Sequence, residues 1–227
     1  MVPGESSIKF RERRAGMCLV TAAAAMAGLV AALGAARGPR GDTSPLPAAT
    51  RAAAQSLENK VRSLEAPDPR AGSPASPVVI TENEVNAYLQ VHGPEFLPAG
   101  VREPSARLQP EHVTGAATVN FDEFSRTYGN PNDWGPKVLA SMFNGSQKVT
   151  VTAKVVSQNG EAKVDIESVT VGSTKLPSWL IEFVLQNYVQ PRYKLDLSKP
   201  IRLPEHVRQL VLGTGQAIFL RDPAKTH

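Results

Sequence analysis

The sequence predicts an α+β protein, in which a strongly curved antiparallel sheet wraps around one or two apolar helices, with a transmembrane or signal helix before it. Three observations lead to this fold class. Residues 15–36 form a long segment without charge, residues 149–172 alternate as a long hairpin, and residues 179–189 are apolar with few exceptions. A length of 227 residues fits one domain with additional tails.

The first 37 residues predict export from the cytoplasm. Residues 15–36 hold 22 residues without a charge and follow the basic stretch K-F-R-E-R-R. As a helix they would be about 33 Å long, enough to cross a hydrocarbon core of about 30 Å. The positive-inside rule leaves the N-terminus in the cytoplasm and the rest of the chain outside.

Two alternatives follow for this segment. It is a permanent anchor, which predicts a single-pass protein of the cell membrane that contacts the membrane through residues 15–36. Alternatively it is a signal peptide cut near Ala36, since small residues lie at the cleavage positions, and the protein is then secreted or periplasmic.

Residues 38–77 are predicted to be a Pro/Gly/Ala-rich linker with a short helix. Within residues 48–65 the apolar residues Leu57, Val61 and Leu64 lie at i, i+4 and i+7, which predicts a helix with a narrow apolar stripe. Residues 66–77 contain four prolines and should be extended. We expect this linker to hold an extracytoplasmic α+β domain, residues 78–227, away from the membrane that residues 1–37 enter.

The extracytoplasmic domain opens with a helix whose start is well marked. Thr81 and Glu84 form a capping box, so the helix begins after Thr81. Val85, Tyr88 and Leu89 lie at i, i+3 and i+4 and make one apolar face. A strand over residues 113–121 follows, since its apolar and polar residues alternate.

A long hairpin is predicted around Asn159-Gly160, the residue pair typical of a type I′ turn. Counting outward from this turn gives a register in which apolar residues face each other and charges are complementary. The expected pairs are Val155 with Val164, Ala153 with Ile166, and Lys154 with Asp165. The alternation then breaks near Ser168, which predicts a bulge or bend and, with it, strong curvature of the sheet.

A second helix is predicted between Pro177 and Pro191. From Trp179 to Val189 its only polar side chains are Glu182, Gln186 and Asn187, so it is apolar on nearly all sides. Such a helix is buried in a core or faces lipid. We therefore expect it to lie on the concave face of the sheet.

The sequence offers no constellation of catalytic residues. The four histidines are scattered singly, and no phosphate-binding, dinucleotide-binding or serine-nucleophile motif occurs. Residues 1–37 carry five basic and two acidic residues, a net +3 of the total +4, so the rest of the chain is nearly neutral. These patterns argue against an enzyme, a metal or other cofactor, and a nucleic-acid partner.

Two stretches of the extracytoplasmic domain carry a resemblance to a known family. I-T-E-N-E-V-N-A-Y-L and Q-N-G-E-A-K-V-D-I-E-S-V-T-V-G-S-T-K-L-P-S-W-L-I-E-F-V-L resemble membrane-anchored bacterial proteins of the TULIP-like, or tubular lipid-binding, class. The resemblance covers residues 78–220. It implies a helix cradled by a curved antiparallel sheet and an apolar groove for lipid acyl chains.

The prediction for function is an exported, membrane-tethered envelope protein that binds a lipid or other apolar ligand between helix and sheet. The expected ligand-binding residues are Val85, Tyr88, Leu89, Trp179, Leu180, Phe183, Val184 and Tyr188. The alternative is a structural or adaptor protein of the envelope, in which the same helices fill a sealed core and no ligand binds. The sequence names no protein partner.

Overall fold

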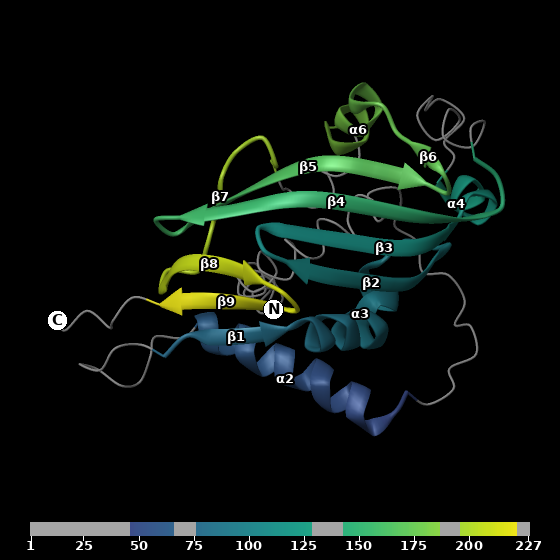
Figure 1. Ribbon diagram of the computed structural model, residues 1–227. Coiled ribbons are helices and arrows are strands. Elements are labelled where there is room, and N and C mark those ends of the chain that lie inside the picture. Colours follow the sequence, from purple (N-terminus) through teal and green to yellow (C-terminus); the bar gives the residue numbers. More distant parts are fainter. Residues whose placement is uncertain (1–45, 66–75, 129–142, 187–195, 222–227) are drawn as a thin grey trace, which may run out of the picture.

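A computed structural model describes residues 46–65, 76–128, 143–186 and 196–221 (Figure 1). The predicted membrane or signal segment, residues 15–36, lies outside these ranges. Within them, no helix has both the length and the apolar character needed to cross a membrane.

The described residues form helices and antiparallel strands. The helices are α2 (Ala48–Glu65), α3 (Glu82–Phe96), α4 (Phe121–Tyr128) and α6 (Ser178–Val184). The strands are β1 (Val78–Thr81), β2 (Val101–Gln109), β3 (His112–Asn120), β4 (Ser146–Gln158), β5 (Glu161–Val171), β6 (Thr174–Lys175), β7 (Ile201–Arg202), β8 (Val207–Gly213) and β9 (Gln216–Arg221). The α+β class with antiparallel strands is confirmed.

Two sheets organise these strands. The larger sheet has the order β2-β3-β4-β5-β6, with β7 paired to β5 as well, and the smaller has the order β1-β9-β8. Figure 1 shows the long strands of the larger sheet as one layer, with the smaller sheet and helices α2 and α3 beside it. The smaller sheet contacts the larger one mainly through β8 and β4.

The hairpin of β4 and β5 has the predicted register. Asn159 and Gly160 both have positive φ, 53° and 76°, as a type I′ turn requires. The pairs Ala153 with Ile166, Lys154 with Asp165, and Val155 with Val164 are all present. Thr152 then pairs with Ser168, which leaves Glu167 as an extra residue in β5. The bulge expected near Ser168 is therefore confirmed, one residue earlier in the chain.

The prediction that the sheet is strongly curved was wrong. The larger sheet is open and does not wrap around a helix (Figure 1). One bulge bends a single pair of strands, whereas a strongly curved sheet needs bends repeated across neighbouring strands. The apolar face is instead covered by other elements, because α3 packs on β2 and strand β8 packs on β4.

The core is built from the alternation of the long strands. Along β4, Val149, Val151, Ala153 and Val155 are buried, while the residues between them are partly exposed. Strand β3 alternates in the same way. Phe121, predicted as the last residue of this strand, is instead the first residue of α4. These buried positions join α2, α3, α6 and the smaller sheet in one apolar cluster.

Candidate ligand site beneath helix α2

The three residues predicted from the first helix lie at one apolar hollow. Val85 and Leu89 are buried on α3, and Tyr88 beside them is half-buried. All three line a cavity of about 60 Å³ between the helices and the two sheets. The full lining is Leu57, Val61, Ile80, Val85, Tyr88, Leu89, Leu108, Val113, Val155, Leu210, Leu212, Ala217 and Phe219. Apart from the Tyr88 hydroxyl, these side chains carry no polar atom.

Helix α2 supplies one wall of this hollow. Its inward residues Ala54, Leu57, Val61 and Leu64 repeat at intervals of three and four, so they form a stripe along one side of the helix. Leu57 and Leu64 are 3% and 0% exposed, and Leu57 and Val61 face the hollow. The helix predicted for residues 48–65 is thus confirmed with the same bounds, and it packs against the domain that follows it.

The residues predicted from the second helix lie elsewhere. None of Trp179, Leu180, Phe183 and Val184 belongs to the lining of the hollow. Leu180 is buried in the common core, whereas Trp179 at the start of α6 is 58% exposed. Tyr188 lies outside the described residues. The structure therefore does not bring the two predicted helices together at one ligand groove.

The size of the hollow limits what it holds while α2 is in place. A water molecule needs about 10–15 Å³ of cavity, so about 60 Å³ has room for a few atoms. A full acyl chain is much larger. The lining offers almost no hydrogen-bond partners, and an apolar cavity of this kind stays dry.

Aromatic rings continue from the hollow along α3. The ring centroid of Tyr88 lies 4.8 Å from that of His92 and 6.2 Å from that of Phe96. These residues follow one another at intervals of four, so they form a stack on one side of the helix. The stack holds Tyr88, the largest side chain from α3 at the hollow, in position.

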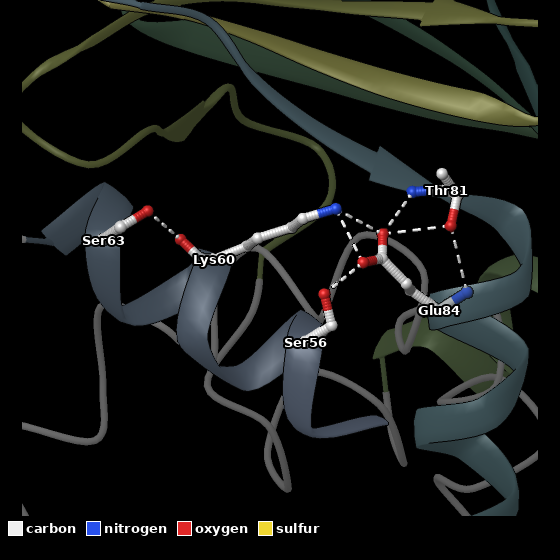
Figure 2. A network of polar contacts seen from close by, with 5 residues as sticks. All are labelled: Ser56, Lys60, Ser63, Thr81 and Glu84. Carbon is white, nitrogen blue, oxygen red and sulfur yellow. Dashed lines mark hydrogen bonds and ion pairs between the residues drawn. The ribbon is translucent and has the colours of Figure 1, made fainter. Parts of the chain in front are cut away.

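A buried carboxylate joins α2 to α3 (Figure 2). Glu84 is 7% exposed and accepts hydrogen bonds from Lys60 Nζ at 2.6 and 2.8 Å and from Ser56 Oγ at 2.5 Å. Thr81 donates to it from its backbone nitrogen at 2.8 Å and its hydroxyl at 3.0 Å. We call Ser56, Lys60 and Glu84 the clasp. The capping box predicted for Thr81 and Glu84 is confirmed, but no pattern in the sequence indicated a partner of Glu84 on α2.

The electrostatics of the clasp favour the charged carboxylate. Burial of Glu84 raises its pKa, but the hydrogen bonds from Lys60, Ser56 and Thr81 outweigh burial and lower the pKa to about 2. Glu84 is therefore ionised at neutral pH. A second ion pair, between Glu58 Oε1 and His92 Nε2 at 2.9 Å, joins the same two helices when His92 is protonated.

Helix α3 is fixed to the larger sheet by two polar side chains that sequence analysis did not single out. The amide of Asn86 pairs with the backbone of Ala106, donating at 2.9 Å and accepting at 2.7 Å. Glu82 accepts from the backbone nitrogen of Leu108 at 2.7 Å. Both lie one turn apart on α3, and both satisfy the edge of β2 that no described strand pairs with. In the sequence, the spacing of four residues between Glu82 and Asn86 was the only sign that both face the same neighbour.

Other polar features of the described residues do not form a catalytic or metal centre. No group of three metal-ligating side chains is found there. A second hollow, about 560 Å³, lies at the tip of the β4–β5 hairpin and is open to solvent. Its charged residues are of both signs, two arginines (Arg202 and Arg208) and two glutamates (Glu161 and Glu205).

Comparison with known proteins gives no family for this chain. No protein-family model matches the sequence, and no curated protein matches it either.

Proposed function

We propose that this protein is an exported, membrane-tethered component of the cell envelope that binds an acyl chain or another long apolar molecule. The ligand occupies the hollow between helices α2 and α3 and the two sheets. One observation carries the proposal: the lining of the hollow is apolar throughout, except for one hydroxyl, and helix α2 supplies one of its walls.

Empty space inside a protein lowers its stability. Protein interiors are packed as densely as organic crystals, and a void forfeits the attraction between the atoms that line it. An apolar void therefore lowers stability unless something fills it. Apolar side chains from six strands and two helices surround this hollow, and a chain of methylene groups would match their chemistry.

The sequence gives independent support. The stretches that resemble the tubular lipid-binding class include Val85, Tyr88 and Leu89, which line the hollow. The charge-free segment at residues 15–36 supports a place at the membrane, where apolar ligands are found. The open sheet requires a different groove from the one expected, between helices and two sheets instead of inside one curved sheet.

A structural or adaptor role is the second candidate. The observation that favours it is the small volume of the hollow, about 60 Å³, which a slight repacking of the core would remove. In this case α2 closes a sealed core permanently, and the protein acts through its surface.

Native mass spectrometry of the full-length protein after gentle extraction distinguishes the two candidates. Ligand binding predicts a bound lipid mass and uptake of a fluorescent fatty acid. Ala217→Val places extra atoms in the hollow and should reduce uptake. Ala162→Val is the matched control, since Ala162 is also buried on a strand but does not line the hollow. A protein that carries no lipid and takes up no probe refutes ligand binding.

A further inference from the structure

We infer that helix α2 is a displaceable cover, which leaves α3 and β1 while the rest of the domain stays folded and so opens the hollow. The role of this motion in ligand access rests on the proposed function. The displacement itself does not, and it can be measured without any ligand.

The packing of α2 is confined to one side of the molecule. Its main neighbours are α3 and β1, whereas the strands of the larger sheet contact one another along their whole length. On the inward side of α2, Ala54, Leu57 and Leu64 are buried and Val61 is partly buried, whereas the opposite side is exposed. Local opening of one peripheral element costs less free energy than global unfolding, even when that element buries one apolar face.

The domain keeps its own supports when α2 is removed. Strand β1 pairs with β9, and α3 is bonded to β2 through Asn86 and Glu82. Glu84 keeps both bonds from Thr81, so the capping box of α3 does not need α2. Displacement of α2 therefore breaks the packing of its apolar stripe and its polar bonds to α3, and it leaves these supports in place.

The geometry of the hollow makes α2 the wall that has to move. An acyl chain does not fit in about 60 Å³, so binding requires displacement of a lining element. Each lining strand is held by backbone hydrogen bonds to a neighbour in its sheet. Within the described part of the chain, helix α2 has no such bonds to another element, and its departure would expose the face formed by Val85, Tyr88 and Leu89.

The clasp sets how often the cover opens. Two side chains of α2, Ser56 and Lys60, meet on the single carboxylate of Glu84. Opening transfers this carboxylate to water and separates it from its counter-charge. A change at the clasp should therefore alter opening without altering the rest of the core.

A pair of matched cysteine variants measures displacement. Ala54 on α2 and Ala153 on β4 are 1% and 0% exposed, so Ala→Cys is the same change in equally buried sites. Each is made in the full-length chain with Cys18→Ser, and modification by a thiol reagent is timed under native conditions. We expect the Ala54→Cys thiol to react about a hundredfold faster, since only α2 has to leave. Equal rates would overturn the inference, because both thiols would then need global unfolding.

The clasp is tested in the same background. Lys60→Met should speed modification of the Ala54→Cys thiol about tenfold or more, since it removes a hydrogen-bonded charge pair. Lys163→Met, which removes a solvent-exposed pair with Asp165, is the matched control and should leave the rate unchanged. Rates that do not respond to Lys60→Met would show that the clasp does not hold the cover.

Cross-linking connects the cover to ligand access. Glu58→Cys and His92→Cys, again with Cys18→Ser, replace two residues whose side chains meet between α2 and α3. The pair joined by a short bismaleimide should lose uptake of a fluorescent fatty acid at least about tenfold relative to the unjoined pair. Equal uptake would overturn the role of α2 in access. If no form takes up the probe while the Ala54→Cys thiol still reacts quickly, the proposed function fails and the displacement of α2 stands.

Discussion

Glu84→Gln tests the clasp most directly. Glutamine serves as well as glutamate at this position of a capping box, so the start of α3 is preserved while the charge is removed. Lowering the pKa from 4.5 to about 2 corresponds to about 3 kcal/mol of preference for the charged form in the folded state, at about 1.4 kcal/mol per pKa unit. The Lys60 side chain is 33% exposed, so water screens part of this attraction. We expect Glu84→Gln to lower the free energy of unfolding by about 2 kcal/mol at pH 7.

The sign of the pH dependence follows from the direction of the shift. The folded-state pKa of Glu84 is lower than the unfolded value, so its contribution is fully present above pH 4.5 and is lost as the pH falls towards 2. Urea unfolding followed by circular dichroism from pH 7 to pH 2 should show this loss in the wild-type protein. The Glu84→Gln variant should begin lower and lack this part of the acid dependence.

The matched control for Glu84→Gln is Asp165→Asn. Asp165 pairs with Lys163 at 3.1 Å, but both side chains are more than half exposed, so the change should be worth less than about 1 kcal/mol. If Glu84→Gln were as stable as the wild-type protein at pH 7, or kept the same acid dependence, the argument for a stabilising buried carboxylate would be refuted.

Three further predictions concern other contacts, and urea unfolding tests each of them. Asn86→Ala should lower the free energy of unfolding by about 2 kcal/mol, because it leaves the backbone of β2 without two hydrogen bonds. Asn83→Ala, at an exposed position nearby on α3, is the control and should lower it little. Equal losses would contradict the role of Asn86. Trp179 is 58% exposed, so Trp179→Ala should lower the free energy of unfolding by less than about 1 kcal/mol and leave probe uptake unchanged. Leu180 is 1% exposed, so Leu180→Ala should lower it by about 2–5 kcal/mol. Gly160→Ala should cost about 1–2 kcal/mol because φ is 76°, and an unchanged midpoint would argue against the strained turn.

Much of the local structure could be predicted from the sequence. The bounds of α2, the capping box at the start of α3, and the register of the β4–β5 hairpin all depend on residues close together in the chain. The break in alternation near Ser168 also located the bulge to within one residue of Glu167, because a pleated strand cannot change its buried face without an extra residue.

The arrangement of these elements could not be predicted in the same way. A stripe of Leu57, Val61 and Leu64 shows that α2 has an apolar side, but not which surface covers it. The contact of Lys60 with Glu84 joins residues 24 positions apart, and no local pattern indicates it. Trp179 was assigned to a groove from its chemistry alone, whereas its exposure depends on how α6 meets the sheet.

The position of α2 in the chain relates the predicted membrane segment to the hollow. If residues 15–36 span the membrane, the cover begins at Ala48, after residues 37–47. A fully extended chain of this length reaches about 40 Å at most. The cover would therefore stay close to the lipid surface whether it is docked or displaced, and an opened hollow could receive a chain from that surface. This geometry predicts that lengthening residues 38–47 with a Gly/Ser insert should slow uptake from vesicles in which the protein is embedded. Uptake of a soluble fatty acid probe should be unaffected, and an equal effect on both would mean that the insert had disturbed the domain itself.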